Sequence, residues 1–126
     1  MDNPIRVLVV DDDDDVRETL ELVLETAGFQ VSSACDGARA LEQLRAATDA
    51  PVVLLDLRMP VMSGWDVIDT LRAEGKLDDI AIIICTSSPR DAPVGFEIVT
   101  KPVDLAVLTN VLRRAAERRG DARVEP

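Results

Sequence analysis

The sequence predicts an α/β fold, a doubly wound five-stranded parallel sheet, because apolar segments of strand length alternate with segments of helical periodicity. The clearest strand is 52–56, an unbroken apolar run that ends on the carboxylate of Asp56. Such a run without alternation is typical of a strand buried on both faces, as in the centre of a parallel sheet. Aromatic residues make up only 2% of the chain, so Val, Ile, Leu and Ala have to build the core.

The first half of the chain predicts two strands that flank an amphipathic helix. Residues 5–10 are a mainly β-branched run that contains one Arg, and five consecutive acidic residues, 11–15, follow it. Apolar residues then recur at helical spacing over 16–27, and Gly28 supplies the stop. Acidic side chains cap a helix and favour its dipole at this end, which accounts for part of the acidic run. Residues 29–34 form the second strand.

The remaining elements continue the alternation. Asp36-Gly37 marks a turn into a second helix, and a third helix runs from Trp65 to near Gly75. Residues 80–85 and 96–100 are the fourth and fifth strands. A last helix begins near Asp104, and its arginine-rich end suits the negative end of the helix dipole.

The length of 126 residues indicates one domain, which we place at residues 1–119, with 120–126 as a disordered tail. The net charge of −10 argues against nucleic acid or an anionic membrane as a partner, and it is compatible with divalent cations. Cys35 and Cys85 form no spaced framework, and we expect both in the core. No signal peptide or membrane span is evident, so we expect a cytoplasmic protein.

Polar residues follow four of the five predicted strands. They are Asp11, Asp12 and Asp13 after the first strand, Asp56 after the third, Thr86 after the fourth and Lys101 after the fifth. Because the carboxyl ends of parallel strands form the ligand-binding edge of such a sheet, we expect these groups to converge. Several carboxylates around one point suit Mg²⁺, and one of them can act as a nucleophile toward phosphorus. The hydroxyl and the ammonium would then neutralise the transferred group.

The chain resembles the receiver domain of two-component response regulators, a CheY-like family. The resemblance covers roughly residues 4–116 and is carried by several separately spaced motifs: Val9-Val10-Asp11-Asp12-Asp13, Leu54 to Pro60, Ser63-Gly64, Thr86 and Lys101-Pro102. It implies the flavodoxin-like strand order 2-1-3-4-5. It also implies a cis bond before Pro102.

The resemblance further implies a role for each site residue. Asp56 would be the phosphoacceptor, and Asp11, Asp12, Asp56 and the backbone carbonyl of Arg58 would hold Mg²⁺. Thr86 and Lys101 would each contact a phosphoryl oxygen. We expect Asp13 to be a helix cap and Asp14 and Asp15 to be solvated, while Ser87 stays the second candidate for the hydroxyl role.

The sequence departs from the family between Thr86 and Lys101. Only 14 residues separate them, and the fifth strand leaves nine for the crossover, which contains two prolines. A parallel crossover normally needs about a dozen residues and a helix, so we expect the fourth helix to be missing or severely shortened. The aromatic switch residue that members often carry three positions before the lysine is Ile98 here. We expect Val94, Phe96 and Ile98 to form an uncovered apolar patch suited to a homodimer or a partner.

The leading hypothesis is a stand-alone signalling domain, not an enzyme, that phosphorylates and dephosphorylates itself. The chain has no histidine, so the phosphoryl group would come from a sensor histidine kinase or a histidine phosphotransfer protein. The signal would pass to an unknown downstream protein by contact. We also suggest that the Arg58 guanidinium alters the lifetime of the phosphoryl group.

Two alternatives remain open. One is a pseudo-receiver that binds partners without phosphorylation, and the other is a phosphatase of the haloacid dehalogenase type, whose nucleophile would come from the first strand. An EF-hand is excluded, because Val16 stands where glycine is required and Leu22 where the bidentate Glu belongs.

Overall fold

The computed structural model describes residues 4–124, which form a parallel sheet with strand order β2-β1-β3-β4-β5. Every pair of neighbouring strands is parallel. The strands are β1 (Arg6–Val10), β2 (Gln30–Ala34), β3 (Val52–Leu55), β4 (Ile82–Thr86) and β5 (Glu97–Thr100). The predicted fold class and strand order are therefore confirmed.

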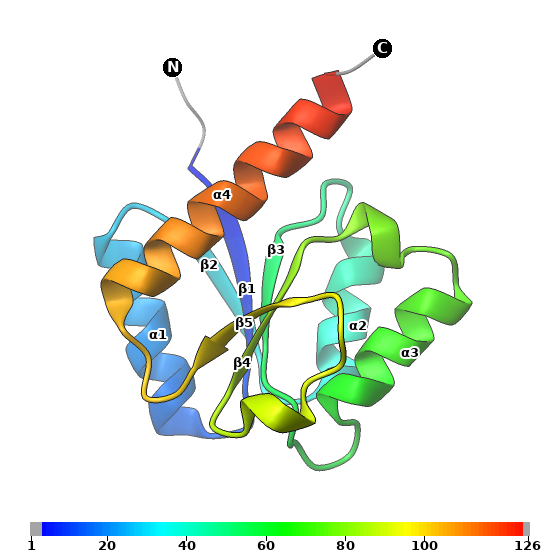
Figure 1. Cartoon of the computed structure of the whole chain (residues 1–126), viewed down its shortest axis with the longest axis horizontal. Helices are drawn as coiled ribbons and strands as arrows, with labels where there is room; N and C mark the ends of the chain where they lie inside the picture. Colours follow the sequence, from blue (N-terminus) through cyan, green and yellow to red (C-terminus); the bar gives the residue numbers. More distant parts are fainter. Residues whose placement is uncertain (1–3, 125–126) are drawn as a thin grey trace.

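Helices cover both faces of this sheet. Figure 1 shows α1 and α4 on one side and α2 and α3 on the other, which is the doubly wound arrangement. The α-helices are α1 (Asp14–Thr26), α2 (Gly37–Ala46), α3 (Gly64–Ala73) and α4 (Leu105–Val124), and the 3-10 helices are η1 (Leu77–Asp79) and η2 (Pro89–Asp91).

The core has two layers, one on each face of the sheet. Alternate strand residues point to opposite faces, so neighbouring side chains enter different layers. On the α1 and α4 side, Val7 and Leu54 pack with Leu108 and Leu112. The layer on the α2 and α3 side includes Leu8, Leu41, Val53, Leu55 and Ile68. All of β3 is buried, as its unbroken apolar run predicted.

The helix starts follow the predicted capping residues. The Asp13 carboxylate accepts hydrogen bonds from the backbone N–H groups of Asp15 and Val16, at 2.9 and 3.2 Å, so Asp13 is the N-cap of α1. Asp36 caps α2 by accepting from the N–H of Arg39. Helix α1 is followed by Gly28, whose φ of 99° lies in the left-handed region that favours glycine. The interpretation of Asp13 as a cap is therefore confirmed.

The crossover between β4 and β5 carries only η2, a three-residue 3-10 helix, among the described residues. In Figure 1 it is the short yellow-green turn and the loop that leads from it into β5. This confirms the prediction that the helix expected between these two strands is missing or severely shortened. The helix labelled α4 is the C-terminal one.

Most predicted strand bounds agree with the structure to within a single residue, and three predictions differ in a larger way. Strand β4 starts at Ile82 and not at Ile80, because the N–H of Ile80 bonds back to Leu77 and closes η1. Cys35 is only partly buried, because it lies just beyond the end of β2, whereas Cys85 is buried as predicted. Helix α4 continues past Gly120 to Val124, into the predicted tail, since one glycine destabilises a helix by only about 1 kcal/mol. Residues 125–126 of that tail lie outside the described residues.

None of the helices within residues 4–124 has the length and apolar character needed to cross a membrane.

Candidate functional site

The ends of β1 and β3 bring three carboxylates together. These strands are neighbours in the sheet, with Val10 beside Leu55, so the residues that follow them meet at one edge. The Asp56 N–H donates to the carbonyl of Val10 at 3.0 Å, which holds the ends of β1 and β3 together. One carboxylate oxygen from each of Asp11, Asp12 and Asp56 lies within 4.8 Å of the others. The predicted convergence of these acids is observed.

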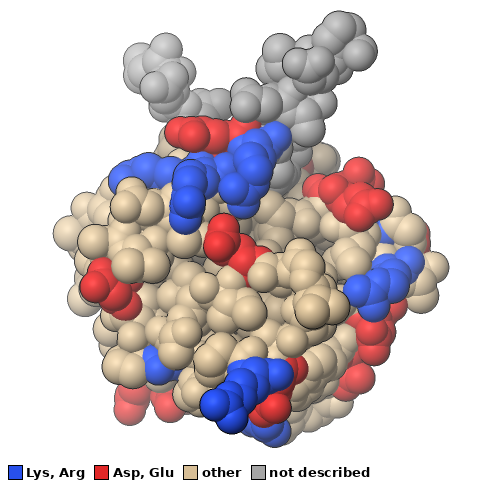
Figure 2. All heavy atoms as spheres, in the orientation of Figure 1, with Lys and Arg blue, Asp and Glu red and all other residues tan. Residues whose placement is uncertain are grey.

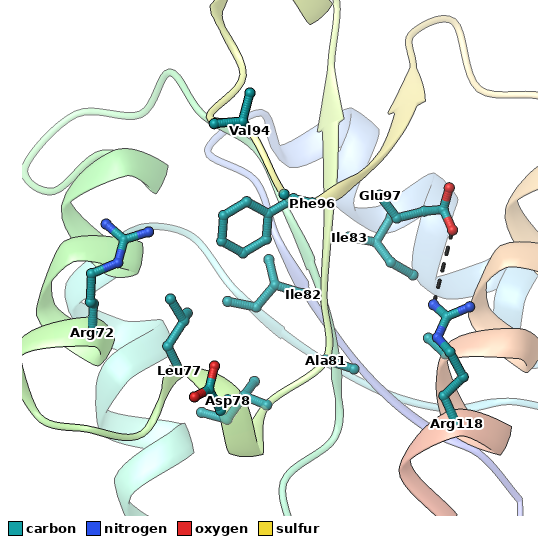
Figure 3. A pocket seen from close by; sticks show the side chains of 13 residues that line it. Arg72, Leu77, Asp78, Ala81, Ile82, Ile83, Val94, Phe96, Glu97 and Arg118 are labelled. Carbon is teal, nitrogen blue, oxygen red and sulfur yellow. Dashed lines mark ion pairs between the residues drawn. The ribbon is translucent and has the colours of Figure 1, made fainter. Parts of the chain in front are cut away.

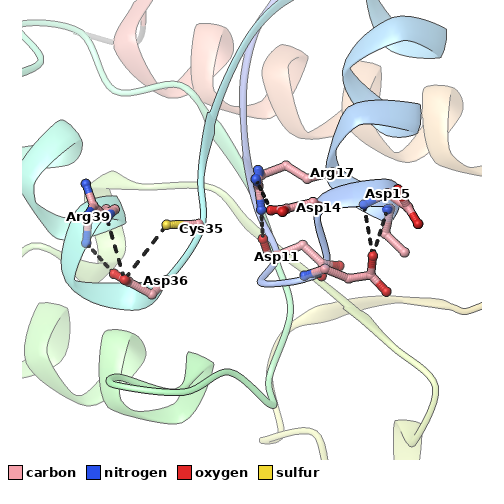
Figure 4. A network of polar contacts seen from close by, with 9 residues as sticks. Asp11, Asp14, Asp15, Arg17, Cys35, Asp36 and Arg39 are labelled. Carbon is pink, nitrogen blue, oxygen red and sulfur yellow. Dashed lines mark hydrogen bonds and ion pairs between the residues drawn. The ribbon is translucent and has the colours of Figure 1, made fainter.

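The acidic loop after β1 is held in shape by its own backbone and by Arg17. Asp11 is 3% exposed, and its carboxylate accepts the N–H of Asp13 at 2.9 Å. Arg17 donates to the carbonyl of Asp11 at 2.8 Å and pairs with Asp14 at 2.5 Å (Figure 4). Arg17 is not among the site residues predicted from the sequence. The spacing of Asp14 and Arg17 by three residues in a helix would have suggested the ion pair.

Lys101 supplies a positive charge to this cluster. Its ammonium lies 2.8 Å from Asp11 and 3.7 Å from Asp56, so it links both acid-bearing strand ends. The Lys101 N–H donates to the carbonyl of Thr86 at 2.9 Å, which anchors the start of the loop after β5. The peptide bond between Lys101 and Pro102 is cis, as the resemblance implied.

Thr86 ends β4, next to β3 in the sheet. It is 3% exposed, and its Oγ1 accepts the N–H of Ser88 at 3.0 Å. A hydroxyl that accepts in this way keeps its own proton to donate to an anion. Ser87, the second candidate for the hydroxyl role, is exposed.

Burial and charge shift the pKa values of two groups in the site. Burial raises the pKa of Asp56, and the neighbouring Asp11 adds to the rise, while Lys101 acts in the opposite direction. For Lys101, burial acts to lower the pKa, but the hydrogen bond to Asp11 and the charges of Asp56 and Asp11 together raise it. Burial thus favours the neutral form of Asp56, while the neighbouring acids favour the charged form of Lys101.

The loop that follows Asp56 depends on glycine at position 64. A Cβ on Gly64 would lie 2.3 Å from the carbonyl oxygen of Asp56 and 2.9 Å from the Cα of Leu57. The Gly64 N–H also donates to the carbonyl of Leu57 at 2.8 Å. Ser63 and Asp66 then form a capping box that starts α3. The close approach of two backbone segments thus sets the position of Asp56.

Arg58 lies in this same loop, but its guanidinium contacts groups outside the acid cluster. It lies 2.5 Å from the Asp91 carboxylate and 5.5 Å from the centroid of the Trp65 ring. Asp91 was not predicted from the sequence, because it lies 33 residues further along the chain and no sequence spacing signals such a pair.

The donor set fits a hard divalent cation. Three carboxylate oxygens around one point are the ligands that Mg²⁺ prefers, with its remaining positions filled by water or phosphate oxygens. A buried hydroxyl and an ammonium at the same edge suit a tetrahedral anion. The arrangement can therefore bind a metal ion and a phosphoryl group side by side.

Comparison with known proteins agrees with this geometry. Residues 7–113 match the family model of the response regulator receiver domain. The chain is 39% identical over 120 residues to the transcriptional regulatory protein PrrA of Mycobacterium leprae, which covers 91% of this chain and 51% of PrrA. The chain thus spans about half the length of the curated relatives that it matches.

Solved structures share the fold. The response regulator StyR has a TM-score of 0.82 and 30% identity, over 96% of this chain and 63% of StyR. The response regulator protein TrrA of Thermotoga maritima, solved in complex with Mg(2+)-BeF, has a TM-score of 0.74 and 29% identity, over 88% of this chain and 98% of TrrA. The family match over residues 7–113, together with the fold and the cluster of acids at the strand ends, shows that this chain belongs to the response regulator receiver domain family.

Proposed function

We propose that this receiver domain accepts a phosphoryl group on Asp56 from a histidine kinase or a histidine phosphotransfer protein. A carboxylate oxygen of Asp56 attacks the phosphorus, an acyl phosphate bond forms, and the phosphorus–nitrogen bond to the donor imidazole breaks. The imidazole leaves with the bonding electron pair and takes up a proton. The observation that carries the proposal is the meeting of Asp11, Asp12, Asp56 and Lys101 at one edge of the sheet.

The surroundings of the two central acids favour Asp56 over Asp11 as the acceptor. Asp11 is 3% exposed and is already bonded to the Asp13 N–H and to Lys101. Asp56 is half-buried and lies further from the ammonium. A dehalogenase-type phosphatase would use a nucleophile from the first strand, which corresponds to the less accessible of the two acids. The assembled set of charged groups also opposes the pseudo-receiver alternative.

Receiver domains hold Mg²⁺ at an acidic site, and the residues present here fit that ion. We propose that Asp11, Asp12, Asp56 and the backbone carbonyl of Arg58 hold it. When bound, Mg²⁺ would neutralise negative charge on the phosphoryl oxygens. The solved complex of the relative TrrA with Mg(2+)-BeF supports this assignment.

Thr86 and Lys101 would hold the transferred group. The Thr86 hydroxyl has its proton available, and it lies at the end of the strand next to β3. The Lys101 ammonium lies 3.7 Å from Asp56, close enough to move onto an oxygen of a group attached there. Its bond to Asp11 would weaken as it does so.

The test is incubation with Mg²⁺ and acetyl phosphate, followed by intact-mass analysis and peptide mapping. We expect the wild type to gain the mass of one phosphoryl group on Asp56. Asp56→Asn should gain none, whereas the matched control Asp13→Asn should behave like the wild type, because Asn also caps a helix. Uptake on Asp11, or equal uptake by Asp56→Asn, would overturn the acceptor role.

The output surface would be the face of β5 that the short crossover leaves open. Val94 is 95% exposed and Ile98 is 36% exposed, while Phe96 packs partly against the core layer on the α2 and α3 side. Beside them lies a groove of about 610 Å³, whose lining includes Leu77, Ile82 and Phe96 (Figure 3). Figure 2 shows mostly uncharged side chains in the middle of this view, interrupted by an acidic group, with most other charged groups toward the margins.

We propose that a second copy of the chain pairs at this face. β5 is an edge strand that has no strand partner on its outer side within residues 4–124. Sedimentation should show a concentration-dependent dimer, and Val94→Glu should weaken it. A wild-type chain that stays monomeric at high concentration would refute this interface.

A further inference from the structure

Three contacts link the loop after Asp56, α3 and the β4–β5 crossover to one another. Arg58 pairs with the Asp91 carboxylate at 2.5 Å and lies over the Trp65 ring, 5.5 Å from its centroid. The indole N–H of Trp65 donates to the backbone carbonyl of Asp91 at 3.1 Å. These residues come from the loop after β3, from α3 and from η2. We refer to Arg58, Trp65 and Asp91 as the crossover clamp.

We propose that the crossover clamp holds the crossover in place while Asp56 is unmodified, and that a phosphoryl group on Asp56 releases it. The release occurs because the phosphoryl oxygens attract the Arg58 guanidinium away from Asp91. This inference rests on the proposed acceptor role of Asp56 and adds a route by which its modification reaches the surface.

The charges favour this exchange of partners. A phosphoryl group carries close to two negative charges and three acceptor oxygens, whereas Asp91 offers one charge. A guanidinium binds phosphate oxygens in a fork geometry, and Arg58 is only two residues from Asp56 in the chain. The side chains of Arg58 and Asp91 are 66% and 46% exposed, so their ion pair is solvated and weak. A weak pair is easily exchanged for a stronger one.

The crossover connects the clamp to the groove beside β5. Three residues beyond Asp91, Val94 begins the part of the crossover that lines the groove, which continues through Gly95 and Phe96. Phe96 and Ala92 pack partly against the core on this face. A shift of η2 would therefore change the shape of the groove wall. A crossover helix and an aromatic side chain at position 98 are both lacking, so the clamp offers a route from the loop after Asp56 to the crossover that depends on neither.

The chain offers a direct probe, because Trp65 is its single tryptophan. Its fluorescence reports the stacking of Arg58 and the bond to Asp91 together. The variant Asp91→Asn removes the carboxylate but keeps the backbone carbonyl that accepts the indole N–H. Amide hydrogen exchange of residues 90–96 then measures how firmly the crossover is held.

We expect phosphorylation by acetyl phosphate and Mg²⁺ to raise exchange in this segment about threefold, the effect of losing a solvated ion pair, and to change Trp65 fluorescence. Asp91→Asn should exchange at the faster rate before any phosphorylation, with little further change afterwards. The matched control is Glu74→Gln, which removes the 2.6 Å pair with Arg45 between α2 and α3. It should leave the response of the crossover unchanged.

Intact mass, measured on the same samples, separates this inference from the acceptor role. Phosphorylated wild type with unchanged exchange and fluorescence would overturn the clamp and leave Asp56 as the acceptor. A chain that takes up no phosphoryl group would overturn the acceptor role and the release together. Equal exchange in unmodified wild type and Asp91→Asn would show that the ion pair holds nothing in place.

Discussion

Substituting Asp56 by Asn should stabilise the metal-free chain but leave it less stable than the wild type in saturating Mg²⁺. In the absence of metal, three carboxylates share one edge of the sheet with the ammonium of Lys101. At an effective dielectric constant of about 20, a pair of unit charges near 4 Å interacts by roughly 4 kcal/mol. Burial is the largest cause that raises the pKa of Asp56; Asp11 and Asp12 add to the rise, while Lys101 acts against it.

The direction of the Asp56 pKa shift also indicates that the ionised carboxylate lowers the stability of the metal-free fold. Because its pKa is raised in the folded state, the stability that it contributes is present at acidic pH and is lost as the pH rises through the folded value. At neutral pH the ionised carboxylate destabilises the metal-free fold. We expect Asp56→Asn to be more stable than the wild type by about 1 kcal/mol in EDTA, a rise in Tm of a few degrees.

Magnesium should invert this order. A ligand that binds only the folded state stabilises it by about 2.7 kcal/mol at a hundredfold excess over Kd. The wild type should gain this amount, whereas Asp56→Asn has lost one of its three carboxylates and should gain much less. Urea unfolding in EDTA and in saturating Mg²⁺ measures the free energy of unfolding of each protein with and without metal, and Asp13→Asn is the control. Equal stabilisation of wild type and Asp56→Asn by Mg²⁺ would refute the proposed metal site.

Three further predictions follow from other parts of the structure. Arg58→Ala should change the dephosphorylation rate of the phosphorylated chain several-fold, and an unchanged rate would refute a role for the guanidinium. Gly64→Ala should lower the free energy of unfolding in urea by about 1–3 kcal/mol, because its Cβ would overlap the Asp56 carbonyl; a loss below that range would mean that the loop can move aside. Burial raises the pKa of Cys85 to about 11, so its contribution to stability is complete below pH 9 and disappears as the pH approaches 11. The wild type should therefore lose about 2–3 kcal/mol more than Cys85→Ala between these pH values, and parallel losses in chemical unfolding would count against the shift.

Apolar runs that end in a polar residue explain how much of the fold and the site could be predicted from the sequence. The run at 52–55 has no polar position, so only a central strand can bury it, and Asp56 then has to lie at the carboxyl edge. Asp11 and Lys101 follow their own strands in the same way. The missing helix could be predicted as well, because a parallel crossover as short as that between Thr86 and Lys101 has no room for one.

What the sequence did not predict depends on contacts between distant segments. Arg58 has nothing near it in sequence to indicate that Asp91 would be its partner, because the crossover has to fold back over α3 before the two meet. The partial exposure of Cys35 and the start of β4 at Ile82 depend on local turns, which propensity fixes only to within a few residues.

The strand order also has a consequence for how the chain folds as it is synthesised. β1, β2 and β3 are adjacent and come first, and β4 and β5 then add in turn to one side, so the sheet can grow outward as the ribosome releases it. α2 and α3 are available early to cover their side. The α1 side stays half open until α4 delivers Leu108 and Leu112, both with no exposed surface in the finished fold. A nascent chain that stalls before α4 would therefore expose an apolar surface that chaperones can bind.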